Sequence, residues 1–514
     1  MDQYCGRMRT TREVSLPLTL DRNSVEPLPA QLASQLRHLL GQGVLVPGDP
    51  LPSSRALAAQ VATSRGTVVA AYEQLMAEGY VSATGGSATV VNPQLRRVRP
   101  ALGVGRRPGR EPAAPILDLT PGRPWPGEVV GRAWTTAWRQ ASTAPVLASV
   151  PALGLVELRQ AWSEHLRRMR AVVREPDHVV VTGGGREGLA LLLLSLGSSA
   201  RGRTGRPLKV AVEEPGYPSL RRVPARLGAE LVGLPVDEHG LVTTDLPVGS
   251  AAPDVLVVTP SHQYPLGGSL PIDRRQRLLD WARAEHVVVV EDDYDSELRY
   301  TSEPLPALAS LDDPDEGTVV LLSTLSKTLT PTLALGFLAL PSRLLESVRE
   351  ARVDLGQPVS LVTQRALANY LASGALRQHT QRMRRRYRRR RTQVVAALSR
   401  LPGVTVYPMD GGLHAVVETE RPEAEVVAQL ARAGVRVSAL SEYWSGSSNR
   451  SGLVFGFGAL NEEELSRALT AIERAATGAA SGAPNPARDS LGGDSLEAQR
   501  TTQRRTLAHD RGRP

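Results

Sequence analysis

The stretch HVVVVEDDYD, residues 286–295, joins four consecutive valines to a run of acidic and aromatic residues. An unbroken run of β-branched apolar residues is typical of a strand that is buried on both faces, as in a parallel sheet covered by helices. The valines therefore predict a central strand, with Asp292 and Tyr294 near its end. In open α/β sheets, ligands bind at the carboxyl ends of the strands.

Four other apolar runs have the same pattern, in which apolar residues are followed by glycine, acidic, hydroxyl or aromatic residues. They are DHVVVTGGG at 177–185, LKVAVEEPGY at 208–217, PDVLVVTPSHQY at 253–264 and GTVVLLSTLSK at 317–327. Helical patterns separate the runs, so the sequence predicts an α/β domain with a mainly parallel sheet.

Length and composition limit the number of domains and the classes of protein to which the chain can belong. At about 100–200 residues per domain, a chain of 514 residues is too long for one compact core. Its formal net charge of +9 permits a polyanionic partner such as nucleic acid. The single cysteine, Cys5, excludes an intramolecular disulfide framework, and no run approaches the roughly 18 apolar residues that span a bilayer. We expect a cytoplasmic protein with no secretory signal, no membrane partner and no metal site.

The N-terminal part, residues 25–92, shows three helical patterns followed by a hairpin pattern. Thr63 or Ser64 can cap the third helix, and Gly85 and Gly86 suit the hairpin turn. The side chains that we expect inside this module are Leu32, Leu36, Leu39, Leu40, Val68, Tyr72, Leu75 and Met76.

Composition divides the rest of the chain into three parts. Residues 93–115 are rich in proline, glycine and arginine without periodicity, which predicts a linker. Residues 116–475 carry the five strand patterns and form the predicted α/β domain. Residues 476–514 contain too little apolar surface to fold and are predicted to be a disordered tail.

The N-terminal module resembles a known DNA-binding family. Residues 51–80 read LPSSRALAAQVATSRGTVVAAYEQLMAEGY, which is similar to the GntR-type winged helix-turn-helix. The resemblance implies a double-stranded DNA operator as partner, with the third helix in the major groove. By this resemblance, Arg55, Ser64, Arg65 and Thr67 contact phosphates and base edges, as helix N-termini and arginines do elsewhere.

The large domain also resembles a known fold. The order of EEPGYP, TPSHQYPLGG, EDDYDSELRY and SKTLTP is similar to that in fold-type I aminotransferases, which use pyridoxal 5′-phosphate. Both parts together, from about Leu28 to about Ala471, resemble the MocR regulators of the GntR family. That resemblance implies a homodimer and a small-molecule effector, which is an amino compound or pyridoxal phosphate itself.

Each matched residue has a chemical reason. Lys327 is the amine that forms a Schiff base with the aldehyde, and Asp292 is the carboxylate that faces the protonated ring nitrogen. By resemblance, Tyr294 lies near the ring hydroxyl, Tyr217 stacks on the ring, and His262 lines the same face.

Phosphate recognition is expected at a glycine-rich helix start. Backbone N–H groups at Gly184 and Gly185 and the hydroxyl of Thr324 are the implied donors. The chain departs from the family at two places: Ala334 replaces an arginine that pairs with the phosphate, and Ala459 replaces an arginine that clamps an amino acid carboxylate. Thr328 or an arginine from elsewhere in the chain can compensate for the first loss.

Three functional hypotheses follow. The first is a transcription regulator that reads an operator and senses a small molecule through the aminotransferase-like domain. The second is a pyridoxal phosphate-dependent aminotransferase, and the third is a regulator that has lost the cofactor and binds another ligand in the pocket. The run QRMRRRYRRRR at 381–391 predicts either the solvated face of a helix or a second DNA contact.

Overall fold

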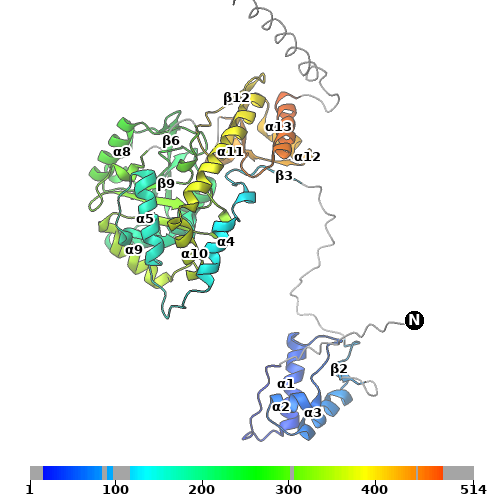
Figure 1. Cartoon of the computed structure of the whole chain (residues 1–514). Helices are drawn as coiled ribbons and strands as arrows, with labels where there is room; N and C mark the ends of the chain where they lie inside the picture. Colours follow the sequence, from blue (N-terminus) through cyan, green and yellow to red (C-terminus); the bar gives the residue numbers. More distant parts are fainter. Residues whose placement is uncertain (1–15, 84–88, 96–115, 301–305, 447–449, 479–514) are drawn as a thin grey trace, which may run out of the picture. The chain divides into compact units, whose positions relative to one another are not determined.

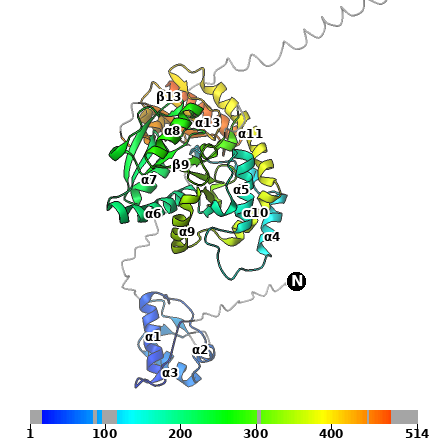
Figure 2. The ribbon, with the colours of Figure 1, turned by 90° about the vertical axis from the view of Figure 1, so that its left-hand side faces the viewer.

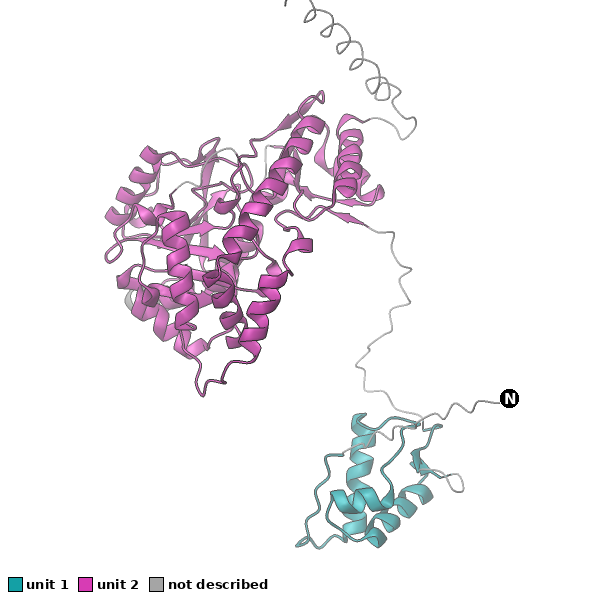
Figure 3. Cartoon of the chain, viewed as in Figure 1, with its two compact units in different colours: residues 1–111 teal, residues 112–514 magenta. Residues whose placement is uncertain are grey.

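The computed structural model describes residues 16–83, 89–95, 116–300, 306–446 and 450–478. The chain divides into two compact units, residues 1–111 and 112–514 (Figure 3). Most of the predicted linker, the hairpin turn at Gly85 and Gly86, and nearly all of the predicted tail lie outside the described residues. Each unit has a hydrophobic core of its own.

Unit 1 is a three-helix bundle with a small antiparallel strand pair (Figure 1). Ser64 caps the third helix, as one of the two alternatives predicted. The interior predictions are confirmed except for Met76, which is 38% exposed. A helix turns about 100° per residue, and the residue after Leu75 lies outside the buried stripe. The elements are α1 (Leu28–Gln42), α2 (Ser54–Gln60), α3 (Arg65–Ala77), β1 (Val81–Ser82) and β2 (Val90–Val91).

Unit 2 is built on an eight-stranded sheet in the order β4-β11-β10-β9-β8-β5-β6-β7. All five predicted runs form strands of this sheet, and β10, β9, β8, β5 and β6 are parallel neighbours. The predicted α/β class with a mainly parallel sheet is therefore confirmed. The strands are β4 (Val179–Thr182), β5 (Lys209–Glu214), β6 (Glu230–Asp237), β7 (Gly240–Leu241), β8 (Val255–Val258), β9 (Val288–Asp293), β10 (Val319–Thr324) and β11 (Gly336–Ala339).

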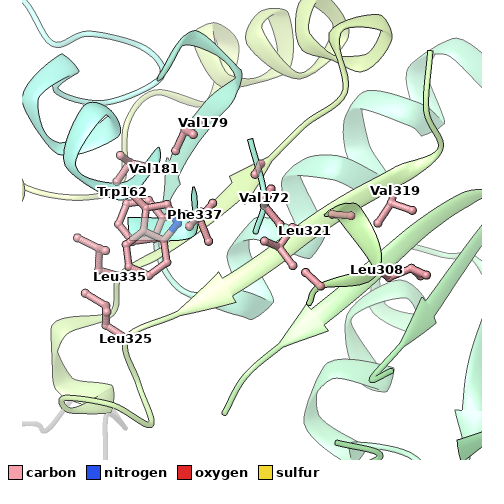
Figure 4. Packing of buried hydrophobic residues seen from close by; sticks show 14 of the residues in the cluster. Trp162, Val172, Val179, Val181, Leu308, Val319, Leu321, Leu325, Leu335 and Phe337 are labelled. Carbon is pink, nitrogen blue, oxygen red and sulfur yellow. The ribbon is translucent and has the colours of Figure 1, made fainter. Parts of the chain in front are cut away.

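Helices cover both faces of this sheet, which is why its strands lack alternation. One face packs against α5, α8 and α10, and in that core Trp162 stacks on Phe337 with ring centroids 4.0 Å apart (Figure 4). The other face packs against α6, α7 and α9. Figures 1 and 2 show β9 in the middle of unit 2 in both views. The helices are α4 (Arg132–Ser142), α5 (Val156–Arg170), α6 (Gly185–Thr204), α7 (Pro218–Arg226), α8 (Ile272–Ala284), α9 (Ser342–Leu355) and α10 (Leu361–Ala372).

A second, antiparallel sheet forms the C-terminal part of unit 2, and its order is β12-β13-β16-β15. It shares a core with α11, α12 and α13. A separate pair, β3 with β14, joins segments that are more than 300 residues apart in the chain. The elements are β3 (Leu117–Asp118), α11 (Ala375–Leu398), β12 (Val404–Val406), β13 (His414–Thr419), α12 (Glu423–Arg432), β14 (Val435–Arg436), β15 (Ser438–Ala439), β16 (Gly452–Gly456) and α13 (Glu462–Thr477).

Short 3-10 helices connect several of these elements. They are η1 (Pro126–Glu128), η2 (Pro176–His178), η3 (Gly249–Ala251), η4 (Ser296–Leu298), η5 (Leu308–Ser310), η6 (Pro331–Leu333) and η7 (Leu440–Tyr443). Within the described ranges, no helix combines the length and the apolar character that a membrane span requires.

Candidate functional site

Lys327 lies in the turn that follows β10, at the carboxyl edge of the large sheet. Its Nζ is 6.0 Å from the centroid of the Tyr217 ring. Gly122, with φ of 77°, lies against the same amine, because a Cβ atom at this position would be 2.2 Å from Nζ. The amine makes no hydrogen bond or ion pair with any described residue. A primary amine in a confined, ring-lined space is free to react with a carbonyl group.

Asp292, near the end of β9, is the acidic counterpart of this amine. Its side chain is buried, and it has no hydrogen-bond or ion-pair partner among the described residues. Burial raises the pKa of Asp292 to about 7, Asp293 adds to the increase, and the Lys327 ammonium opposes it. A buried carboxylate without a partner fits a ligand that brings a protonated ring nitrogen.

Tyr294 and His262 are joined in a buried polar cluster. The Tyr294 hydroxyl donates to the backbone carbonyl of His262 at 3.0 Å and lies 3.0 Å from the His262 Nδ1. The same Nδ1 is 3.0 Å from Asp295 Oδ2, so Asp295 orients the imidazole. Asp295 was not among the predicted site residues, although it belongs to the same EDDYD motif as Asp292.

Aromatic rings extend this cluster towards Tyr217. Tyr217 is the N-cap residue of α7 and packs edge-to-face on Tyr264, with ring centroids 5.0 Å apart. His414, from β13 of the second sheet, lies 4.7 Å from the Tyr264 ring and 5.6 Å from the His262 ring. Burial, with the nearby His262, lowers the pKa of His414 to about 4, so this imidazole is neutral near pH 7. No sequence motif marked His414, because its position depends on packing between the two sheets.

The glycine-rich turn after β4 meets the ends of β10 and β11. Thr324 pairs with Gly336, and Gly336 pairs with Thr182 on its other side. A Cβ atom at Gly336 would be only 3.1 Å from the Gly184 Cα, so the turn and the strand touch. Gly184, Gly185 at the start of α6, and Thr324 are therefore brought to one edge of the sheet, where the N–H groups of α6 favour an anion.

The two departures from the family pattern can be located on this framework. Ala334 follows η6 with φ of 46°, two residues before Gly336, and thus belongs to the turn that reaches the predicted phosphate position. Ala459 lies three residues after the end of β16. A Cβ atom at the preceding residue, Gly458, would be 2.4 Å from the backbone carbonyl oxygen of Arg123, which is the neighbour of Gly122. Neither alanine can supply a cation.

The four predicted DNA-contacting residues lie on α2 and α3 of unit 1. Ser64 caps α3 by accepting a hydrogen bond from the Thr67 backbone N–H at 3.1 Å, and their hydroxyl oxygens are 2.9 Å apart. Arg65 Nε donates to Ser54 Oγ at 3.2 Å, which joins the start of α3 to the start of α2. Arg55, Ser64 and Arg65 are exposed. This places two guanidinium groups at the amino-terminal ends of adjacent helices.

The arginine run lies within α11, and only part of it forms the predicted solvated face of a helix. Arg390 is buried, and its guanidinium donates to the backbone carbonyls of Phe457, Gly458 and Leu460. Arg386 is 2.7 Å from Glu128 and stacks over Trp125. The helix has an inner face because it packs against the second sheet. Of the other six arginines, Arg384 and Arg391 are half-buried, and four are exposed: Arg382, Arg385, Arg388 and Arg389.

Two family models match the chain. Residues 28–91 match the bacterial regulatory proteins of the gntR family, and residues 125–472 match aminotransferase class I and II. Among solved structures, an archaeal alanine:glyoxylate aminotransferase has a TM-score of 0.64 at 22% identity, over 71% of this chain and 92% of that one. A kynurenine aminotransferase of Pyrococcus horikoshii has a TM-score of 0.62 at 21% identity, over the same shares of both chains. These structures establish the fold, and the two family matches define the class: a helix-turn-helix regulator with an aminotransferase-like domain.

Curated relatives make the assignment more specific. The pyridoxine biosynthesis transcriptional regulator PdxR of Corynebacterium glutamicum is 46% identical over 460 residues, which cover 90% of this chain and 98% of the relative. The probable rhizopine catabolism regulatory protein MocR of Rhizobium meliloti is 31% identical over 485 residues, which cover 89% and 95%. The chain therefore belongs to the MocR-type family of DNA-binding transcriptional regulators.

Proposed function

We propose that unit 2 binds pyridoxal phosphate through Lys327 and that this binding changes the affinity of unit 1 for its operator. The main support is that two groups make no hydrogen bond or ion pair with any described residue. They are the Lys327 amine and the buried Asp292 carboxylate. Lys327 is also one of only two lysines in a chain with 61 basic residues. The name of the relative PdxR, a regulator of pyridoxine biosynthesis, supports a vitamin B6 compound as the effector.

When bound, pyridoxal phosphate supplies an aldehyde that reacts with amines and a ring that withdraws electrons. In this proposal, Lys327 holds the aldehyde end and Asp292 accepts a hydrogen bond from the ring nitrogen. Tyr217 and His262 line the ring, and the Tyr294 hydroxyl lies near its oxygen substituent. The phosphate is held by N–H groups of Gly184 and Gly185 and by the Thr324 hydroxyl.

With alanine at position 334, phosphate binding is weaker than it would be with an arginine there. A charge-assisted pair with phosphate is roughly twice as strong as a neutral hydrogen bond. We therefore propose an effector that dissociates readily, which suits a sensor better than a permanently loaded enzyme. A coupling of about 1–3 kcal/mol between the two sites changes operator affinity by roughly 5- to 150-fold.

We also propose that the protein acts in the cytoplasm as a homodimer on a double-stranded operator. The segment between α4 and α5 exposes Val146, Leu147 and Val150, of which Val146 is 97% exposed. Exposed apolar side chains that lie close together favour burial against a second subunit. A two-fold dimer presents two DNA-reading helices to two half-sites.

The decisive experiment uses the low lysine content of the chain. The purified protein is mixed with pyridoxal phosphate, reduced with borohydride and digested, and the modified lysine is identified by mass spectrometry. We expect modification of Lys327, none in Lys327→Ala, and full modification in the control Lys209→Ala, which replaces the only other lysine. Modification of Lys209 alone, or of neither lysine, contradicts the proposal.

Two other functions remain as alternatives with their own tests. Lys327, Asp292 and Tyr294 also suit an aminotransferase, and steady amino transfer from a common amino acid that Lys327→Ala abolishes would establish that activity. Ala334 and Ala459 favour the second alternative, a regulator that has lost the cofactor. In that case pyridoxal phosphate leaves operator affinity unchanged, and a different ligand in the same pocket alters it.

A further inference from the structure

A small polar cavity lies behind the turn that carries Lys327. Its volume is about 20 Å³, and α5, the segment after β9, and the end of β10 with its turn form its walls. Asp292 and Asp293 are consecutive residues of β9 and point to opposite faces of the sheet, so the cavity that Asp293 lines is on the other side from Asp292. Tyr294 and Thr324, which the proposed cofactor site also uses, contribute to the cavity wall, but Asp292 and Lys327 do not.

Five buried polar atoms that line the cavity have no hydrogen-bond partner among the described residues. Leaving a buried polar group unpaired is costly, and native proteins rarely tolerate several at one place. The atoms are Trp162 Nε1, Asp293 Oδ1, Glu297 Oε2, Ser323 Oγ and Thr328 Oγ1.

The carboxylates around the cavity already have charge partners. Asp293 Oδ2 accepts from Arg170 Nε at 2.8 Å, and Glu297 Oε1 is 2.5 Å from His165 Nε2. Burial by itself would lower the pKa of His165, but Glu297 and Asp293 together outweigh burial and raise it. Asp295, the third carboxylate in the wall, pairs with His262. Each acid therefore faces a base, and a neutral guest fits better than a cation.

Water matches this set of atoms in type, and one water molecule can pair with up to four of the five. The indole N–H only donates and the carboxylate oxygens only accept, while the hydroxyls of Ser323 and Thr328 do either. A metal ion would leave the indole N–H unpaired and would place a second positive charge beside Arg170. A water molecule needs roughly 10–15 Å³ and two to four polar partners, so the cavity has room for one.

We propose that the cavity holds one ordered water molecule, and that this water fixes the turn that carries Lys327. Ser323 and Thr328 lie on either side of Lys327 in the sequence, so a water that binds both hydroxyls closes the turn from behind. Its hydrogen bonds to Asp293 and Glu297 join that turn to the segment after β9.

A crystal structure of the full chain at high resolution tests the site directly. We expect a single density peak at roughly 2.6–3.2 Å from at least three of the five atoms. An empty cavity overturns the proposal. A peak with several oxygen ligands at about 2.0–2.4 Å overturns it as well, because those distances indicate a metal ion.

A matched pair of variants tests the contribution of the water to the turn. Thr328→Val removes one partner of the water without changing the side-chain shape. Thr318→Val is the control, because the Thr318 hydroxyl is also buried and unpaired but is not part of the cavity wall. We expect Thr328→Val to lower the melting temperature of unit 2 by about 2 °C or more, and Thr318→Val to leave it unchanged.

Hydrogen exchange distinguishes an effect on the turn from a general loss of stability. Backbone amides of residues 323–330 are expected to exchange several-fold faster in Thr328→Val than in the parent protein, with no change in Thr318→Val. Equal exchange rates and equal melting temperatures for the two variants would show that no water binds at Thr328.

Discussion

The ionisation of single buried residues carries much of the chemistry of unit 2. Asp292 lies next to Asp293, yet the two carboxylates have different environments. Asp293 pairs with Arg170, whereas Asp292 has no partner among the described residues and a pKa raised by burial to about 7. Of these two neighbouring carboxylates, that of Asp293 is therefore structural, and that of Asp292 is available to a ligand.

The raised pKa of Asp292 predicts a pH dependence of stability. Because the folded state holds this proton more tightly than the unfolded chain, its contribution to stability is lost as pH rises from about 4 to about 7. The shift corresponds to at most about 4 kcal/mol. We expect the cofactor-free Asp292→Asn protein to melt at a higher temperature than the parent at pH 8, and at a similar temperature at pH 4.5. If the two proteins differed in melting temperature by the same amount at both pH values, the raised pKa of Asp292 would be contradicted.

At this scale, the sequence identified the residues with distinctive chemistry but not all of their neighbours. Lys327, Asp292 and Tyr217 stand in motifs that follow strand patterns, so their common edge of the sheet was predictable. Gly122 and His414 come from distant segments without a motif. Their positions beside Lys327 and His262 result from packing between the two sheets, which has no local signal.

Two helices of the chain carry arginines for different purposes. Arg65, at the start of α3, is exposed. We expect Arg65→Ala to lower operator affinity by about tenfold or more, since an arginine contact to a base is worth roughly 1–3 kcal/mol. Arg37→Ala is the control, because Arg37 pairs with Glu78 within the same module. Electrophoretic mobility shifts at fixed salt measure both variants. Equal losses would mean that Arg65 contributes charge alone.

In α11, neighbouring arginines have opposite environments. Arg390 is buried and satisfies three backbone carbonyls, whereas Arg389 is exposed. Removing the buried guanidinium leaves those carbonyls unpaired, at a cost of roughly 1–3 kcal/mol for each group. We expect Arg390→Met to lower the melting temperature of unit 2 by several degrees, and Arg389→Met to leave it almost unchanged. Similar melting temperatures for the two variants would show that the carbonyls find other partners.

The elements themselves were predictable to different degrees. Long apolar runs and amphipathic patterns revealed the large sheet and the helices of unit 1. The second sheet was missed in part because its two outer strands, β12 and β15, contain only three and two residues. Strands of this length carry no periodic pattern, and the β3–β14 pair depends on contacts between distant parts of the chain.

The whole molecule combines two units with separate cores, and this organisation predicts its thermal behaviour. We expect two transitions in differential scanning calorimetry, because each unit buries its own apolar residues. A ligand stabilises only the state that binds it, by about 2.7 kcal/mol at a hundredfold excess over Kd. Pyridoxal phosphate should therefore raise the transition of unit 2 alone, and operator DNA should raise that of unit 1. One merged transition would indicate that the units unfold together.

The turn at Ala334 has a consequence for how such a regulator changes over time. A left-handed backbone costs an ordinary residue roughly 1–2 kcal/mol, yet the chain retains this conformation at a site with only a methyl group to present. Replacing Ala334 alone can therefore introduce a longer, charged side chain, because the backbone at this position already has the left-handed conformation of the turn. Selection can adjust the residence time of an anionic signal in this way, and the rest of the fold stays as it is.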